Sequence, residues 1–264
     1  METHGLIDVT WLDLGFAAAL VLVAIALSWW QRLGLARGFA IGAVRATVQL
    51  VLVGYVLAYL FATRRWYLVL LALLVMLIAA TKTATDRQRG SRRVLFPITG
   101  TAMLLGAGFT LAYVDAIVLR VRPWYDPQYA IPLFGMIIGN AMNGAALAAE
   151  RLASEMEARR GEVEAYLALG ASPAMAAAEA VRRALVAALI PAVNGLMIVG
   201  LVSLPGMMTG QILAGSSPTT AVRYQIVVAF MLAGAVAITA TIVVLWYRRS
   251  FFTAAEQLIP RVAV

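Results

Sequence analysis

Residues 150–183 read ERLASEMEARRGEVEAYLALGASPAMAAAEAVRR, and they interrupt a chain that is otherwise strongly apolar. The stretch contains six glutamates and five arginines, and long apolar segments flank it on both sides. A membrane protein that keeps one large polar helical excursion on one side of the bilayer usually offers it to a soluble partner. We call residues 150–183 the elbow.

The composition around the elbow is that of a membrane protein. Of the 264 residues, 62% are hydrophobic and only 13% are charged, whereas charged residues make up about 25% of a soluble domain. The apolar blocks approach the roughly 20 helical residues that a 30 Å hydrocarbon core requires. The alternating segments of about ten residues that are typical of a β-barrel are not seen. We therefore predict an all-α polytopic integral membrane protein with one domain, residues 1–264.

Seven apolar segments are long enough to be considered as membrane spans. They are residues 8–30, 39–61, 66–81, 94–119, 129–149, 184–203 and 222–247. The third segment is short, and without it the protein would have six spans and its N-terminus on the other side. Tryptophan and tyrosine residues lie at several segment ends, as interfacial aromatic residues do.

Arginine and lysine residues predict the orientation. With the N-terminus outside, fifteen of these residues lie in inner loops and five in outer loops, and Arg45 lies within a span. Because positive residues are enriched in cytoplasmic loops, we expect the C-terminus and the elbow to be cytoplasmic. The basic excess therefore sets topology, and we expect no nucleic-acid partner.

Within the elbow, the pattern predicts a helix, a break and a second helix. Gly170 offers the left-handed backbone that ends many helices. Ser172 and Pro173 form a typical helix start, with an N-cap residue followed by a first-turn proline. The exposed tip would be residues 169–171. We expect the fifth span to continue beyond the membrane as the first charged helix.

The elbow resembles the docking loop of ABC-transporter permeases. Glu164, Ala165 and Gly170 match the E-A-A-x-x-x-G start of that loop, although Tyr166 replaces the second alanine and the proline at position 191 lies further on than in importer permeases. Five longer stretches are similar to one family, the FetB-type iron-export permeases. These are RATVQLVLVGYVL (45–57), GMIIGNAMNG (135–144), EVEAYLALGAS (162–172), LVSLPGMMTGQILAGSSP (201–218) and AVRYQIVV (221–228).

This resemblance implies a multi-pass permease of the bacterial inner membrane. Its partners would be a FetA-like ATP-binding subunit, a second permease copy, membrane lipid and a metal-ion substrate; plant relatives are associated with aluminium tolerance. The coupling residues would be Glu162, Glu164, Ala165, Leu169, Gly170, Ala171 and Ser172. The alternative is that the elbow is only a solvated helical hairpin.

The chain itself has no nucleotide-binding or catalytic motif. A P-loop requires G-x-x-x-x-G-K-[ST], but the only lysine, Lys82, follows Thr81. The chain has no cysteine and one histidine, His4, so a site built from several of these ligands is excluded. We therefore expect no enzyme activity and no bound cofactor in this chain, with ATP used by the partner and the metal ligands unknown.

Polar residues within the spans are candidates for a substrate pathway, because charges there are costly and often functional. Arg45 and Gln49 share a helix face at a spacing of four residues, and Asp115 is a possible counter-charge. Asn140 and Asn143 lie among small residues. Packing between helices is the alternative for all of these.

Residues 204–221 form an outer connection that carries no charge. Pro205, Gly206 and Gly210 are expected to break helix here, which predicts a broken or re-entrant turn. Its carbonyl groups could face the substrate, together with the side chains of Met207, Met208, Thr209 and Gln211. Thioethers suit soft ions better than Fe(II) or Al(III), and the alternative is that both methionines fill space.

The preferred hypothesis is the permease subunit of an ATP-driven metal exporter. A lipid or amphiphile exporter of the same motor class is the first alternative, because the chain has few metal-ligating residues. An autonomous ion channel or secondary carrier is the second, and a membrane scaffold without transport is the third.

Overall fold

The computed structural model describes residues 10–86 and 92–259, and this part of the chain is almost entirely helical. Seven of the described helices are long and apolar enough to cross a membrane. They are α1 (Trp11–Trp30), α2 (Ala36–Thr63), α3 (Trp66–Asp86), α4 (Arg92–Tyr113) with the π-helical η1 (Val114–Val118), α5 (Pro127–Ala158), α8 (Ala178–Ile198) and α10 (Pro218–Arg249). The predicted fold class is confirmed, including the third span. Helix α3 extends to Asp86, beyond the predicted apolar segment 66–81. Asp8, Arg87, Arg89 and Arg261, which entered the predictions of spans and orientation, lie outside the described residues.

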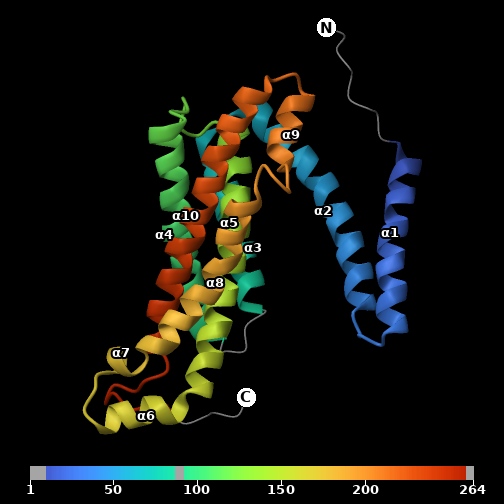
Figure 1. The fold of residues 1–264 in the computed structure, drawn as a ribbon. Helices are drawn as coiled ribbons and strands as arrows, with labels where there is room; N and C mark the ends of the chain where they lie inside the picture. The colour runs from blue at the N-terminus through green and yellow to red at the C-terminus, as the bar shows by residue number, and fades with distance from the viewer. Residues whose placement is uncertain (1–9, 87–91, 260–264) are drawn as a thin grey trace. The chain divides into compact units, whose positions relative to one another are not determined.

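The chain divides into two compact units by its internal contacts. The first contains α1 and α2, which pack against each other as a helical hairpin (Figure 1). Thr10 caps α1 through a capping box with Asp13, in which each residue bonds the backbone N–H of the other. Arg64 ends α2 in the left-handed conformation, with φ of 47°.

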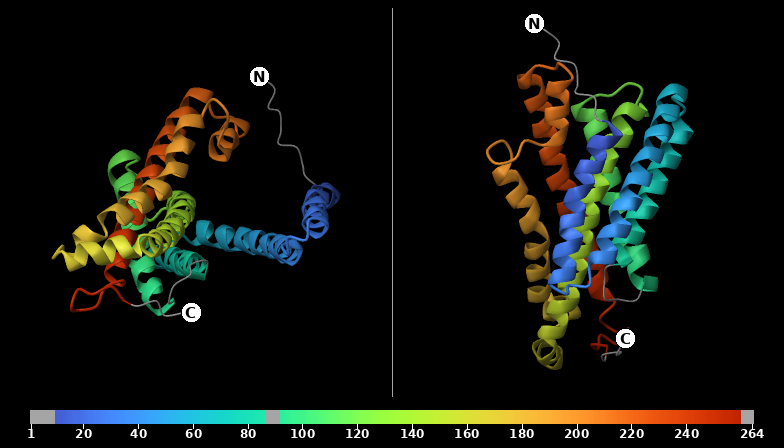
Figure 2. Two further views of the ribbon diagram at one scale, coloured as in Figure 1. Left: turned by 60° about the horizontal axis from the view of Figure 1, so that its bottom comes forward. Right: turned by 90° about the vertical axis from the view of Figure 1, so that its right-hand side faces the viewer.

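The second unit is a bundle of α3, α4, α5, α8 and α10, and residues 213–215 within its sequence range are assigned to the first unit. Helix α5 contacts the other four helices, and α10 contacts α4, α5 and α8 (Figure 2). On α5, Ile137, Ala141, Ala145, Ala148 and Leu152 are fully buried at helical spacing. The centre of the core therefore consists largely of small side chains, which let helix backbones approach closely.

Two glycines show how close these approaches are. A Cβ atom on Gly144 of α5 would lie 2.7 Å from Cγ1 of Val236 on α10. A Cβ atom on Gly106 of α4 would collide with the Thr239 side chain of α10 and lie 3.1 Å from its backbone nitrogen. Glycine at both positions is therefore required by packing against α10.

Two expectations for the connection between α8 and α10 are wrong. The sixth span was expected to reach Ser203, but α8 ends at Ile198, and Gly200, with φ of 84°, begins a turn in which its N–H bonds the Ser203 carbonyl. Pro205, Gly206 and Gly210 were expected to break helix; α9 (Gly206–Leu213) begins only after Pro205, but it runs through Gly210. Glycine in a helix costs only about 1 kcal/mol relative to alanine, so it lowers helix stability without preventing the helix.

Candidate functional site

The elbow has the predicted course of helix, break and helix. Helix α5 continues without interruption to Ala158, α6 (Arg160–Ala168) follows, and α7 (Pro173–Ala176) leads into α8 (Figure 1). The two sides of the elbow are thus continuous in the chain with α5 and α8. Any displacement of the elbow acts on the ends of these two spanning helices.

The break between α6 and α7 is built by specific backbone bonds. Gly170 has φ of 87°, its N–H bonds the Leu167 carbonyl at 3.0 Å, and the Ala171 N–H bonds the Tyr166 carbonyl at 3.0 Å. This pair of bonds is the Schellman arrangement, in which a left-handed residue satisfies the last carbonyls of a helix. The predicted role of Gly170 in ending the helix is confirmed.

The next helix begins as the sequence predicts. Ser172 has extended backbone, its hydroxyl accepts a bond from the Met175 N–H at 3.4 Å, and Pro173 occupies the first turn. A serine N-cap contributes about 1 kcal/mol. The turn is therefore fixed on both sides by capping.

Burial on one face of the elbow holds it against the bundle. Val163 of α6 is 1% exposed, and Ala176 and Ala177 are also buried. They belong to the same apolar core as Met156 at the end of α5. Burying a valine side chain contributes roughly 1.5–3 kcal/mol, so this contact, rather than the surface charges, anchors the elbow.

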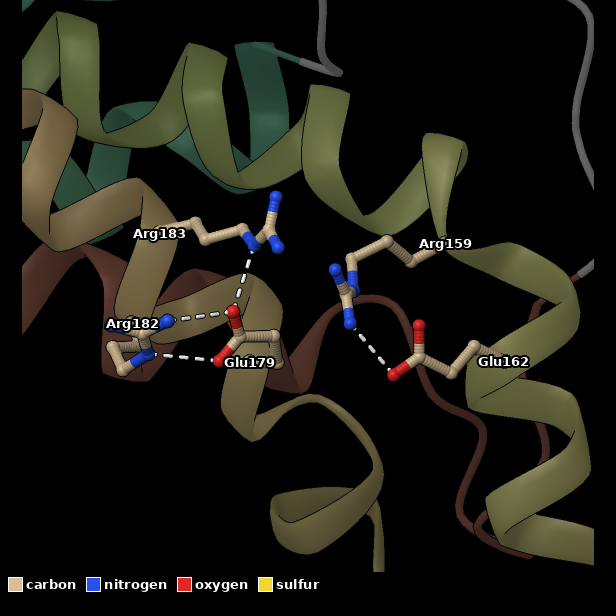
Figure 3. A network of polar contacts seen from close by, with 5 residues as sticks. All are labelled: Arg159, Glu162, Glu179, Arg182 and Arg183. Carbon is tan, nitrogen blue, oxygen red and sulfur yellow. Dashed lines mark hydrogen bonds and ion pairs between the residues drawn. The ribbon is translucent and has the colours of Figure 1, made fainter.

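Ion pairs lie on the elbow, at the start of α6 and the start of α8 (Figure 3). Arg159 bonds Glu162 at 2.7 Å, and Glu179 at the start of α8 bonds both Arg182 and Arg183 at 2.8 Å. Arg160 bonds Glu164 at 2.9 Å and also donates to the Ile259 carbonyl of the C-terminal segment at 3.2 Å. Exposed pairs contribute about 0–1 kcal/mol each, so they add little to the stability of the elbow.

The elbow also exposes apolar side chains at and near its tip. Leu169 at the tip is 85% exposed, and Met175 and Tyr166 are 68% and 48% exposed. Of the predicted coupling residues, Glu162, Glu164, Ala165, Gly170 and Ser172 are exposed and Ala171 is half-buried. Tyr166 and Met175 were not among the predicted coupling residues. Their position beside the glycine–serine break is the sequence signal that identifies them.

The predicted pathway residues separate into several places. Arg45 and Gln49 lie one turn apart on α2 of the first unit, and both are exposed, whereas Asp115 lies in η1 of the second unit. The sequence offered Asp115 only as a possible counter-charge of Arg45, and nothing tests that suggestion. Asn140 and Asn143 lie on α5, about 20 Å and 24 Å along the helix from Pro127 at a rise of 1.5 Å per residue.

Asn140 and Asn143 line two adjoining cavities between α5, α8 and α10. One has a volume of about 230 Å³ and includes Asn140 and Gln225, and the other, of about 170 Å³, includes Asn140 and Asn143. Both cavities are lined by Pro191 of α8 and Val236 of α10. We call these two cavities the amide hollow.

The residues predicted on the outer connection divide between two other cavities. Met207 and Gln211 line a cavity of about 490 Å³ with Met136 of α5. Met208 lines a cavity of about 430 Å³ that also includes Gln225. Since Met207 and Met208 line different cavities, the structure does not bring the two thioethers to one site.

Two details of α9 bear on the predicted substrate contacts. The Thr209 hydroxyl donates within its own helix, to the carbonyls of Gly206 at 3.0 Å and Pro205 at 3.4 Å. Because α9 is helical, much of its backbone is used in helical bonds rather than facing a substrate. Among the described residues, no group of three or more His, Cys, Asp or Glu side chains could hold a metal ion.

The chain is similar to known membrane proteins over nearly its whole length. A model of an uncharacterised protein family, UPF0014, matches residues 11–252. The chain belongs to the UPF0014 family. A UPF0014 membrane protein of Synechocystis is 41% identical, and the match covers 97% of this chain and 99% of that protein.

Other UPF0014 relatives have names that refer to metals. The probable iron export permease protein FetB of Escherichia coli is 36% identical, over 98% of this chain and 97% of FetB. The protein ALUMINUM SENSITIVE 3 of Arabidopsis thaliana is 37% identical, over 92% of this chain and 87% of that protein. No solved structure matches the chain. The family resemblance noted from the sequence is confirmed.

Proposed function

We propose that this UPF0014 protein is the permease subunit of an ATP-driven exporter of metal ions or small metal complexes. The observation that carries the proposal is the elbow, a capped break with an apolar exposed tip that connects α5 to α8 through α6 and α7. Both helices line the amide hollow. A force applied to the elbow therefore acts on the walls of an intramembrane cavity.

The motor would be a separate ATPase chain that docks on the elbow. Leu169, Tyr166 and Met175 would enter an apolar groove of that partner, with Glu162 and Glu164 at its rim. Exposed apolar patches outside a membrane span are typical of such interfaces. Closure of two ATPase subunits on a permease homodimer would tilt α5 and α8 and open the cavity to each side in turn, with the elbow in the cytoplasm.

Iron is the first substrate to test, because of the name of the FetB relative. An amphiphile exporter of the same class is the second candidate, because the cavities are largely apolar and the described residues contain no cluster of metal-ligating side chains. Stimulation of ATP hydrolysis by metal, compared with stimulation by lipid, separates the two.

The first experiment is isolation of the chain from its native membrane in mild detergent, with assay of co-purifying ATPase activity. We expect an ATPase to co-purify with the wild-type chain and to be lost with Glu164→Lys, because the new lysine would face Arg160 and reverse the charge at the rim. Recovery of the chain without any ATPase, together with ion flux through the chain alone in proteoliposomes, would establish the channel or carrier alternative instead.

The exchange Arg160→Glu with Glu164→Arg is the matched control. This double variant restores the ion pair within α6, but the acidic group is now at position 160 and the basic group at position 164. If this double variant stays uncoupled, the charge of Glu164 acts on the partner. If it recovers the ATPase, the pair only stabilises α6, and Glu164 is not a docking residue.

A further inference from the structure

Gln225 of α10 is a buried amide whose carbonyl oxygen lacks a partner. Its side chain is 8% exposed, and Oε1 makes no hydrogen bond with any described residue. A buried amide without a bond costs about 1–3 kcal/mol by mutational measures. Such a group in a membrane protein requires an explanation in terms of packing or function.

The position of Gln225 supplies a functional explanation. It lines the larger cavity of the amide hollow together with Asn140, and it also lines the cavity that contains Met208. Gln225 therefore lies where these two cavities adjoin. The Asn140 amide donates to the Met136 carbonyl of its own helix at 2.9 Å, which fixes it on α5. Carboxamides from α5 and α10 thus line cavities that share lining residues.

The rest of this lining has no charge. Apart from Asn140, Asn143 and Gln225, the three cavities are lined by apolar residues and by Ser203. A bare divalent ion loses its hydration in such a place and is stabilised in proteins by carboxylates or other strong ligands. Carboxamides instead both donate and accept hydrogen bonds. They suit a solute whose polar atoms are many but whose net charge is close to zero.

The volumes agree with a small molecule. The two cavities of the amide hollow measure about 230 and 170 Å³; only together do they reach the roughly 300–1,000 Å³ of small-molecule sites. Asn140 lies about 20 Å along α5 from Pro127, on a helix long and apolar enough to cross a membrane. A charged solute within a hydrocarbon core is costly. The amide hollow is therefore larger than a single ion needs. It also lacks the charged ligands that would stabilise a bare ion.

We propose that the amide hollow binds a solute without net charge through Gln225, Asn140 and Asn143. For a metal substrate, this means a metal enclosed by ligands that cancel its charge. The inference rests on the proposed function as a permease and specifies its substrate class. Gln225, which was not among the predicted pathway residues, becomes a binding residue.

The test is direct binding to the full chain in lipid nanodiscs, without any ATPase. The probes are tris(maltolato)iron(III), which is neutral, and Fe(II) kept reduced with ascorbate. We expect saturable binding of the neutral complex and at least tenfold weaker binding of Fe(II). Preferential binding of Fe(II) by the wild-type chain would overturn the inference.

Two substitutions of Gln225 separate binding from folding. We expect Gln225→Leu to weaken binding of the neutral complex at least tenfold, and Gln225→Glu to shift the preference toward Fe(II). Thr99→Val is the matched control, because Thr99 Oγ1 is also buried without a partner but Thr99 lines none of the described cavities. Unchanged binding in a monodisperse Gln225→Leu variant would refute the role of Gln225.

The outcome is independent of the docking experiment. If the neutral complex does not bind while an ATPase still co-purifies in a Glu164-dependent manner, the substrate class is wrong and the permease function stands. If the neutral complex binds and no ATPase is found, the hollow is a binding site of a protein that is not motor-driven.

Discussion

At the scale of single residues, the elbow depends on one backbone conformation. Gly170 is left-handed, and a Cβ atom there would meet nothing within 4 Å. Sterics against neighbours therefore do not select glycine at this position. The selection comes from the residue's own backbone, because a side chain in the left-handed region costs about 1–2 kcal/mol.

We accordingly expect Gly170→Ala to shift the tip of the elbow and reduce ATPase stimulation by substrate, while membrane insertion is unchanged. Gly161→Ala on α6 is the control, since its site is equally open but its φ is not positive. Alanine at position 161 is expected to leave ATPase stimulation unchanged. It is also expected to stabilise α6 by up to about 1 kcal/mol. Equal stimulation in both variants would show that the turn geometry is not used in coupling.

At the scale of helices, the second unit is organised by contacts of α10 with α4 and α5. The sequence showed small residues in the fifth span, and it allowed either packing or pathway lining for the residues around them. In the structure, Gly144 packs on Val236, while Asn140 and Asn143 of the same helix line the adjoining cavities. Their place in a substrate pathway stays a prediction. The choice depends on the side of α5 that α10 covers, and one sequence does not specify this.

Gly144→Ala tests the α5–α10 contact. The added methyl would overlap Val236 Cγ1, and overpacking of this kind costs about 1–3 kcal/mol. We expect a lower midpoint of thermal unfolding in detergent, with recovery in the double variant Gly144→Ala with Val236→Ala. Gly139→Ala on the same helix has open space and is expected to leave the midpoint unchanged. Equal losses in Gly139→Ala and Gly144→Ala would indicate an effect of helix composition rather than of this contact.

At the scale of the whole molecule, the apolar segments predicted the spans because the bilayer thickness imposes a length on each helix. The helix starts were predicted less well. Helices α5 and α10 begin at Pro127 and Pro218, each after an N-cap residue, Asp126 or Ser217. These signals precede the predicted segments by a few polar residues, which a hydropathy criterion leaves out.

Gln225 was not singled out from the sequence, although it lies within the predicted last span, residues 222–247. Helix α10 begins earlier, and the helix places Gln225 among packed neighbours. Burial of a polar residue depends on tertiary contacts, which the apolar pattern of one segment does not contain.

Orientation in the membrane is tested by labelling of introduced cysteines, because the natural chain has none. We expect a cysteine at Ala158 to react with a membrane-impermeant maleimide only from the cytoplasmic side, and one at Ser217 only from the outside. These positions lie at the end of α5 and the start of α10. The reverse pattern would invert the predicted topology.

A proline in α8 lies where bending of the helix would couple movement of the elbow to the cavities. Pro191 lies inside α8 and lines both parts of the amide hollow. A proline within a helix removes one backbone bond and favours bending there. The part of α8 between Ala178 and Pro191 is then a lever of about 20 Å at 1.5 Å per residue. Rotation of this part of α8 by about 10° about Pro191 would move its elbow end by roughly 3–4 Å. Pro191, the centre of the rotation, lies in the wall of the cavity.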